Sequence, residues 1–364
     1  MSIAQLYSII FLYTVIVLTL IVAFKLSTQD YDRIIKGEYN ASVAFCLCTI
    51  LAVWLGLRPP TYEFSDTGNY ALLFNMSQAG QKLPTNASEW LWYSIIAQCS
   101  KLMDVSAYLS IISLGYFLFH WYACKKLISN NVLAAVIFTL GAFSFYSYSV
   151  NGIRNGLACS ICLSAIAVLS VPNKKLIIGL CLAFICINIH RSTILPIVSL
   201  FASIYIIKSF KWAYYFWIIS IIISLVAGGP ISSFFAGLGF DDRLSYINSS
   251  IDTQKFSYSG FRWDFLIYSM MPIILGYYVV IKRNIKNHTY LILLNTYTLA
   301  NAFWVMVIRA NFSNRFAYLS WLMYPIVLAY PLFKLNIWGD KQGQRTAQIM
   351  LAHVGFTWFM YTIF

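Results

Sequence analysis

Apolar residues run along this chain in long blocks, and short breaks that carry charge separate the blocks. The blocks have about 20 residues, roughly the length at which a helix crosses ~30 Å of hydrocarbon. A soluble chain would instead keep its apolar residues on one face of each helix. The pattern predicts twelve spanning helices, over 4–24, 40–57, 104–122, 131–150, 153–171, 175–189, 193–207, 212–228, 263–281, 288–308, 316–333 and 346–364.

One further apolar run, WLWYSIIAQCSKL at 90–102, is too short to cross the membrane and contains Lys101. We interpret it as an interfacial or re-entrant segment. Because the segment is taken not to cross the membrane, this interpretation determines on which side of the membrane every later break lies.

The lysine-rich breaks occupy every second loop of the predicted bundle, at 25–38, 125–126, 174–175, 208–211, 282–286 and 334–345. Because cytoplasmic loops are enriched in Lys and Arg, these breaks are expected inside and both termini outside. Two long segments, about 58–103 and 229–262, are then extracytoplasmic, and functional residues are expected there. We expect residues 1–364 to form a single transmembrane domain.

Composition agrees with this pattern, since 60% of the 364 residues are apolar, 10% are charged and the mean hydropathy is +0.71. The fold class expected is therefore an all-α polytopic integral membrane protein.

The net charge of +13 reflects topology, and lysines divided among short loops do not predict nucleic-acid binding. Cys159 and Cys162 have CxxC spacing, yet no second pair is near, so core packing is expected and no metal site. The chain contains neither a P-loop nor a dinucleotide-binding fingerprint, so no cofactor is expected.

Arginine is distributed differently from lysine. Twelve of fifteen Lys lie in the predicted cytoplasmic breaks, whereas seven of ten Arg lie outside, at Arg58, Arg154, Arg191, Arg243, Arg262, Arg309 and Arg315. A planar guanidinium suits bidentate contact with phosphate better than a flexible ammonium does. The outer side is therefore predicted to hold an anion with several phosphate oxygens.

These arginines could instead reach lipid head groups or pair with outer acids. For Arg243 and Arg262 the pairing is favoured, because Asp241, Asp242 and Asp264 are one or two positions away. Arg154, Arg191 and Arg315 have no acid that close in sequence, and each ends or begins an apolar helix. A charge in the bilayer centre costs ~2.5–3.5 kcal/mol on insertion scales, so a function is favoured for these three.

Four stretches resemble the EpsG-like and Wzy-type polysaccharide polymerases. In GLRPPTYEFSDTGNYALLF (56–74), an Arg that ends a span is followed by an Asp, a small residue and a Tyr. VNGIRNGLACSICLSAIA (150–167) resembles the motif of an Arg, a polar residue and small residues that open a helix, with Asn155 where Gln is commonest. INIHRSTIL (187–195) and NRFAYL (314–319) are similar to a His-containing break and a late Arg and Tyr of that family.

The resemblance implies a multi-pass glycosyltransferase of the bacterial inner membrane with its active site facing the periplasm. Its substrates would be oligosaccharide repeats carried on undecaprenyl pyrophosphate, as donor and as acceptor, joined into O-antigen or a related polysaccharide. Membrane lipid and a chain-length regulator protein are further partners that the resemblance implies.

In that reaction negative charge develops on the pyrophosphate leaving group, and preorganised Arg side chains stabilise such charge. Arg154 is the predicted pyrophosphate ligand, with Arg191 and Arg315 completing a clamp and Arg58 and Arg309 as further substrate ligands.

A base would accept the proton of the attacking sugar hydroxyl. The candidates are Asp66, Glu63 and His190, and Asp66 stands beside Tyr70, which could bind a sugar. Asp66 could equally form an Asx-turn or cap a helix, and His190 could orient Arg191 or bind a sugar hydroxyl.

Two other classes remain open. A flippase for the same lipid-linked sugar would have a similar number of spans, but it should carry charge deep in the bundle and often shows internal duplication. Neither feature is evident here, since the arginines cluster at the outer ends. A ligase that moves finished polymer onto a lipid core shares the donor and much of the chemistry.

Overall fold

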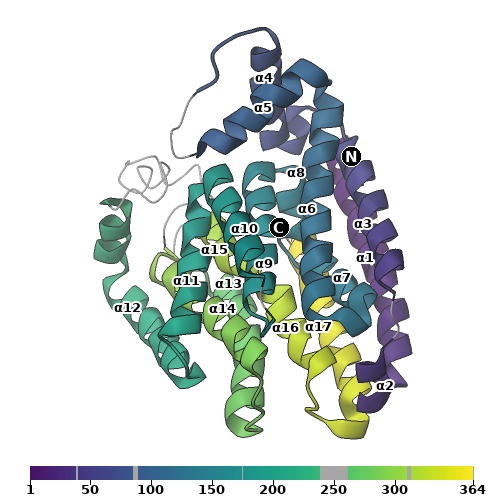
Figure 1. Ribbon diagram of the computed structural model, residues 1–364, viewed down its shortest axis with the longest axis vertical. Helices are drawn as coiled ribbons and strands as arrows, with labels where there is room; N and C mark the ends of the chain where they lie inside the picture. The colour runs from purple at the N-terminus through teal and green to yellow at the C-terminus, as the bar shows by residue number, and fades with distance from the viewer. Residues whose placement is uncertain (38–39, 85–88, 174, 238–260, 310–312, 364) are drawn as a thin grey trace. The chain divides into compact units, whose positions relative to one another are not determined.

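The computed structural model describes the chain except for residues 38–39, 85–88, 174, 238–260, 310–312 and 364, and except for the side chains of 228–237, 313–315 and 363. Every regular element in the described ranges is a helix (Figure 1). The all-α class is thus confirmed. The described residues group into two compact units, Met1–Leu169 with Asn173–His190 and Ala329–Phe364, and Ser170–Pro172 with Arg191–Leu328. The expectation of one transmembrane domain stays a prediction.

The first unit contains most of the helices. These are α1 (Ile3–Ser27), α2 (Tyr31–Lys36), α3 (Ala41–Gly56), α4 (Asp66–Gln78), α5 (Trp90–Leu102), α6 (Val105–Leu127), α7 (Val132–Leu140), α8 (Phe145–Val150), α9 (Ile153–Leu169), α10 (Leu176–Ile189) and α17 (Gln342–Ile363). Short 3-10 turns lie at Tyr62–Phe64, Ser129–Asn131 and Gly339–Lys341.

The second unit contains α11 (Ile194–Tyr205), α12 (Phe210–Gly237), α13 (Trp263–Gly276), a π-helical turn at Tyr277–Lys282, α14 (His288–Met306) and α15 (Ser313–Trp321). A 3-10 turn at Arg191–Thr193 precedes α11. Helix α16 (Tyr324–Lys334) follows α15, and its residues from Ala329 onward belong to the first unit. In this unit α14 packs against α11, α12 and α15. Asn301 of α14 accepts a hydrogen bond from Trp217 Nε1 at 2.7 Å and donates one to Ser320 Oγ at 3.0 Å. Polar side chains of this kind join helices in an apolar environment.

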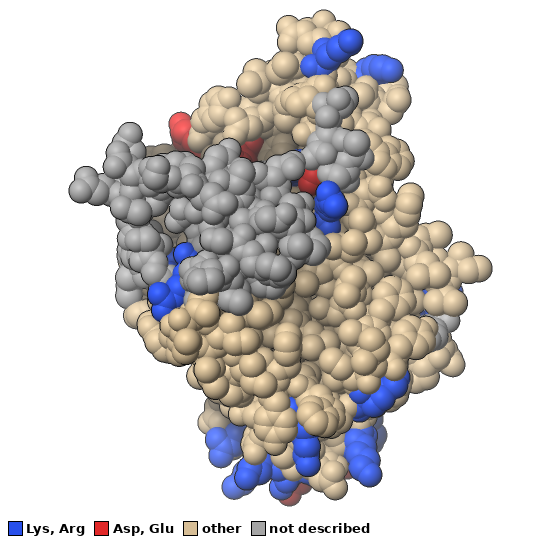
Figure 2. Space-filling model, turned by 90° about the vertical axis from the view of Figure 1, so that its left-hand side faces the viewer, with Lys and Arg blue, Asp and Glu red and all other residues tan. Residues whose placement is uncertain are grey.

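The membrane class follows from the described helices. Five of them are long and apolar enough to cross a membrane, over Ile3–Ser27, Val105–Leu127, Phe210–Ala227, Trp263–Lys282 and Phe316–Lys334. Shorter apolar helices lie at Ala41–Gly56, Ser129–Leu140, Ile153–Leu169, Leu176–Ile189 and Arg191–Tyr205. On the face shown in Figure 2, most of the described surface carries neither basic nor acidic side chains. The number of twelve spans stays a prediction.

The core of the first unit is built around α9. Every residue from Gly156 to Leu169 is buried, and α9 packs between α6 and α10. Small residues such as Ala158, Ser160 and Ala165 let these helices approach closely. Ser164 Oγ also donates a hydrogen bond to the carbonyl of Phe119 on α6, at 2.8 Å. Cys159 and Cys162 are buried in this core as free thiols.

The span predicted at 131–150 is divided, because α7 ends at Leu140 and α8 begins at Phe145. A break in a helix frees backbone carbonyls, which need donors in a medium without water. The last helix supplies them. Thr357 Oγ1 donates to the carbonyl of Gly141 at 2.6 Å, and His353 Nε2 bonds to the carbonyl of Phe138 at 3.0 Å.

The first long outer segment is largely helical. The run at 90–102 forms α5, and residues 66–78, for which no helix was predicted, form α4, which packs on α5. Tyr70 of α4 lies edge-on to Trp92 of α5, with ring centroids 5.6 Å apart. The second outer segment, 229–262, lies mostly outside the described residues, as does Arg243.

Candidate functional site

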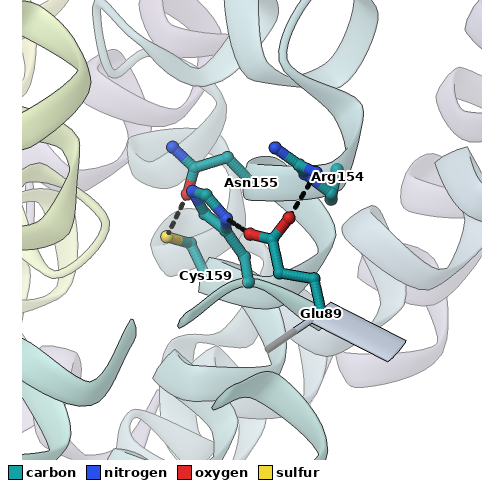
Figure 3. Close-up of polar contacts among 5 residues, drawn as sticks. Glu89, Arg154, Asn155 and Cys159 are labelled. Atoms are coloured by element: carbon teal, nitrogen blue, oxygen red, sulfur yellow. Dashed lines mark hydrogen bonds and ion pairs between the residues drawn. The ribbon is translucent and has the colours of Figure 1, made fainter. Parts of the chain in front are cut away.

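Three segments of the first unit meet at one carboxylate. Glu89 directly precedes α5, Arg154 lies in the first turn of α9, and His190 directly follows α10. Glu89 Oε2 is 2.5 Å from Arg154 Nη1, and Glu89 Oε1 is 2.5 Å from His190 Nδ1. Figure 3 shows the Glu89 carboxylate turned toward the Arg154 guanidinium. We call these three residues the carboxylate bridge.

The carboxylate bridge is almost withdrawn from solvent. The side chains of Arg154, Glu89 and His190 keep 14%, 9% and 7% of their accessible surface. Removing an ion from water costs several kcal/mol, which a well-placed partner offsets. Glu89 therefore offsets part of the cost of burying the Arg154 charge at the end of an apolar helix. Ionisable groups gathered in this way mark candidate functional sites.

Neighbouring contacts position the carboxylate. Glu89 lies at the N-cap position of α5, but its side chain makes no capping bond there. Beside it, Trp90 Nε1 donates to Asn188 Oδ1 at 2.6 Å. Because Trp90 begins α5 and Asn188 lies in the last turn of α10, this bond holds the two helix ends together. Glu89 and His190 are thereby kept within reach of each other.

The backbone around Arg154 is tightly packed. A Cβ atom placed on Gly156 would lie 2.3 Å from the carbonyl oxygen of Tyr148. Glycine at this position lets the start of α9 approach α8, since any other residue would push them apart. Asn155, the next residue after Arg154, accepts a hydrogen bond from Cys159 Sγ at 3.1 Å (Figure 3).

The first outer segment is fastened to the turn between α8 and α9. The backbone N–H of Asp66 donates to Asn151 Oδ1 at 3.0 Å, and Thr67 Oγ1 donates to the carbonyl of Val150 at 2.5 Å. Two of the four motif stretches, 56–74 and 150–167, are therefore in direct contact. Asp66 thus lies beside the turn that leads into Arg154.

Asp66 is half-buried and begins α4, following Ser65, whose φ is +56°. One of its carboxylate oxygens accepts a hydrogen bond from Asn69 Nδ2 at 3.3 Å. An acid in the first turn of a helix interacts favourably with the helix dipole. This geometry is compatible with a local structural role for Asp66 and with a role at the substrate. The role of Asp66 as the base therefore stays a prediction.

Arg58 is 1% exposed and is surrounded by protein acceptors. It donates to the carbonyls of Leu55 and Val150 at 2.8 Å and 3.1 Å, and to Thr67 Oγ1 at 3.2 Å and 2.9 Å. Burial lowers the pKa of Arg58 to about 10, which leaves it charged at neutral pH. These contacts favour a structural role for Arg58 in joining the segment after α3 to α8. The edge-on contact of buried Tyr70 with Trp92 likewise favours packing.

The other predicted arginines belong to the second unit. Arg191 is exposed in the turn before α11, and exposed Arg309 has its Cζ 5.8 Å from the ring centroid of Phe261. Arg315 lies in α15, and its side chain is outside the described residues. A clamp of Arg154 with Arg191 and Arg315 stays a prediction. The pairing expected for Arg262 is confirmed, since two of its nitrogens lie 2.9 Å and 2.6 Å from the Asp264 carboxylate oxygens.

Glu89 is the residue that sequence reasoning missed. It is one of three acids in 58–103 that precede α5, with Glu63 and Asp66, and it stands immediately before the amphipathic run. The sequence did contain a signal for Glu89. Burying the charge of Arg154 is costly, so an acid that pairs with it is expected on the same side of the membrane. Glu63 is exposed, and its Oε2 accepts a hydrogen bond from the backbone N–H of Ile3 at 3.2 Å.

The arrangement joins a cation suited to phosphate oxygens with a histidine whose Nδ1 is held by a carboxylate. Among the described residues, no group of three His, Cys, Asp or Glu could hold a metal ion.

Comparison with known proteins assigns the chain to a family. The sequence model of the EpsG family matches residues 42–363, which include the carboxylate bridge and all four motif stretches. No match was found among curated proteins or among solved structures. Because the match covers nearly the whole chain, this protein belongs to the EpsG family and is a membrane protein with a polysaccharide-polymerase-like function.

Proposed function

We propose that this protein is a glycosyltransferase of the bacterial inner membrane that joins undecaprenyl-pyrophosphate-linked oligosaccharide repeats into a polysaccharide at the periplasmic face. The family supports the polymerase class. The observation that carries the assignment is the carboxylate bridge, in which buried Glu89 contacts Arg154 and His190 from two other helix ends.

The reaction needs two things from the protein. A hydroxyl of the acceptor repeat attacks the anomeric carbon of the donor, the bond from that carbon to the pyrophosphate oxygen breaks, and the lipid pyrophosphate leaves with the electron pair. The site must stabilise the charge on the leaving group, and it must accept the proton of the attacking hydroxyl.

Arg154 is suited to the first task. Its guanidinium carries five N–H donors in a rigid fork, and Glu89 engages Nη1. The carboxylate thus orients the cation before substrate arrives, so the protein need not reorganise during the reaction. The N-terminus of α9, where Arg154 lies, adds the partial positive charge of the helix dipole.

His190 is suited to the second task. A carboxylate only accepts hydrogen bonds, so Nδ1 of His190 is the donor toward Glu89. In the neutral imidazole, Nε2 is then the nitrogen that takes up a proton, as in other sites where a carboxylate fixes the tautomer of a histidine base. Asp66, beside the turn that precedes Arg154, is the second candidate for this base.

The partners proposed are the two lipid-linked oligosaccharides, the surrounding membrane lipid and a chain-length regulator protein, and no cofactor takes part. Donor and acceptor arrive complete on their lipid carriers. The proposed reaction therefore requires no nucleotide.

The test is polymerisation by purified protein in liposomes that contain the lipid-linked repeat as the sole substrate. We expect a ladder of lengthened lipid-linked chains, because donor and acceptor are the same molecule. A flippase would move the repeat across the bilayer without lengthening it, and a ligase would act only after a lipid-core acceptor is added. Either result would reject the polymerase.

A further inference from the structure

A pocket of about 320 Å³ lies in the first unit, where the end of α1, the short helix α2 and the starts of α3 and α7 meet. Three cations line it, namely Lys25, Arg33 and Lys36, and no acid is among its described lining residues. Apolar side chains, including Val22, Leu26 and Leu133, form another part of its wall. We call it the basic pocket. The proposed catalytic function does not use it.

The basic pocket has a fixed wall, because α2 is fastened to the turn before α7. Asn131 Nδ2 donates to the carbonyl of Ile34 at 2.7 Å, and Asn130 Nδ2 donates to the carbonyl of Ile35. At the end of α2, Gly37 has a φ of +59°, and a Cβ placed there would lie 2.2 Å from the carbonyl oxygen of Asn130. Only glycine allows this approach. The cations of α2 are therefore presented on a preformed surface.

The cations of α2 form no ion pair with the described acids of the same segment. Asp30 caps α2, and its Oδ1 accepts the backbone N–H of Arg33 at 2.9 Å. In the described part of the chain, neither Arg33 nor Lys36 forms an ion pair. Both side chains are exposed. Their charge is therefore available to a ligand.

The basic pocket lies at the opposite end of α3 from the carboxylate bridge. Asn40, which lines the pocket, precedes α3, and Arg58, which bonds to Val150 near the bridge, follows it. A helix of 16 residues is about 24 Å long, close to the thickness of the hydrocarbon layer. A spanning α3 thus places the two sites at opposite faces of the membrane.

We infer that the basic pocket binds a phosphate group carried by a lipid, in the leaflet opposite the carboxylate bridge. Lys25, Arg33 and Lys36 supply the donors for the phosphate oxygens. The wall formed by Val22, Leu26 and Leu133 contacts the first carbons of the lipid chain. Basic pockets between membrane helices bind anionic head groups by this combination of charge and apolar contact. A soluble phosphate would use the cations and leave the apolar wall exposed.

The experiment is native mass spectrometry of the purified full chain in neutral detergent, titrated with dioleoylphosphatidylglycerol or with dioleoylphosphatidylcholine. We expect the anionic lipid to remain bound and the zwitterionic lipid to be lost. In the triple variant Lys25→Gln, Arg33→Gln, Lys36→Gln, the affinity for phosphatidylglycerol should fall at least tenfold. The matched control Lys125→Gln, Lys126→Gln, Lys175→Gln removes three lysines from other predicted cytoplasmic breaks and should bind as the wild type does.

The single variant Arg33→Gln keeps the test valid if the triple variant does not fold, since Arg33 is exposed and its loss disturbs no packing. It should weaken binding by about threefold. An equal loss of phosphatidylglycerol affinity in the pocket variant and the control variant would overturn the inference, because the cations would then act only through the overall charge of the protein. In a second experiment, inorganic phosphate is added to the lipid-bound protein. If phosphate alone displaces the lipid at equal concentration, the site holds a soluble anion and the lipid assignment is rejected.

Discussion

Glu89 and Arg154 are 65 residues apart in the chain, yet a carboxylate oxygen of the first lies 2.5 Å from a guanidinium nitrogen of the second. The other carboxylate oxygen lies 2.5 Å from Nδ1 of His190. An arginine that has no acid close to it in sequence is thus held by one from the first outer segment. In the proposed reaction this single carboxylate sets the position of both the pyrophosphate ligand and the base.

Glu89→Gln should abolish most polymer synthesis, because the amide no longer balances Arg154 and holds His190 less firmly. Removing one partner of a buried pair costs ~3–5 kcal/mol, so the thermal stability of the variant should fall too. Polymer length and melting temperature are measured on the same preparation. Glu63→Gln is the control, since Glu63 is exposed and bonds only to the start of α1 in the described structure. Normal polymer from Glu89→Gln would remove Glu89 from the site.

Arg154→Lys keeps the charge but loses the planar fork. The rate should fall by roughly 10²–10³, the loss typical when one preorganised donor is removed from a developing charge. The amount of protein in the membrane should stay normal. Arg262→Lys is the control, because Arg262 pairs with Asp264 two residues away and should tolerate lysine. Full activity of the Arg154→Lys variant would show that positive charge alone suffices at this position.

His190→Asn and Asp66→Asn separate the two candidates for the base. Asparagine at 190 can still donate to Glu89 but cannot accept a proton, and asparagine at 66 keeps the backbone bond to Asn151. The variant that lacks the base should insert normally and yield single repeats in place of long chains. Chain length is measured on gels of the lipid-linked or core-linked product. Wild-type chain length in both variants would exclude both residues.

Thr67→Val should destabilise the protein by ~1–3 kcal/mol, because it leaves buried donors of Arg58 and the carbonyl of Val150 without their shared hydroxyl. The measurement is thermal unfolding in detergent. Thr49→Val makes the same change on α3. Within the described structure the Thr49 hydroxyl bonds to the carbonyl of Phe45 in its own helix, so the effect should be small. If the two variants unfold at the same temperature, Arg58 does not depend on Thr67 for its place.

The orientation proposed from the lysine breaks is tested by an impermeant thiol reagent. In a background without the exposed Cys46 and Cys181, Lys82→Cys should react from the periplasm and Lys175→Cys should not. Both side chains are exposed, so access depends on the side of the membrane alone. Reversed labelling would place the carboxylate bridge on the cytoplasmic side and reject periplasmic polymerisation.

Most helices were predictable from the apolar blocks. The blocks at 40–57, 153–171 and 175–189 correspond to α3, α9 and α10 within two residues at either end, since the charged and polar breaks mark where a membrane helix stops. Helix α4 was not predicted, because residues 66–78 mix polar and apolar positions without a clear period. The break between α7 and α8 was also missed. It depends on donors from α17, which lies more than two hundred residues later.

The sequence by itself determined the membrane class, the helix that carries Arg154, the helix end that His190 follows, and the family to which their motifs belong. These properties depend on local composition and on short motifs. Only the tertiary structure decided that Glu89 faces Arg154, that Arg58 is enclosed by protein acceptors, and that Lys25, Arg33 and Lys36 share one pocket. The physical reason is that these contacts follow from how α5, α9 and α10, and α1, α2 and α7, pack together. Packing depends on side-chain volumes and on backbone groups that need hydrogen-bond partners where a helix is broken. These partners come from distant parts of the chain, so the spacing of residues within one segment does not reveal them.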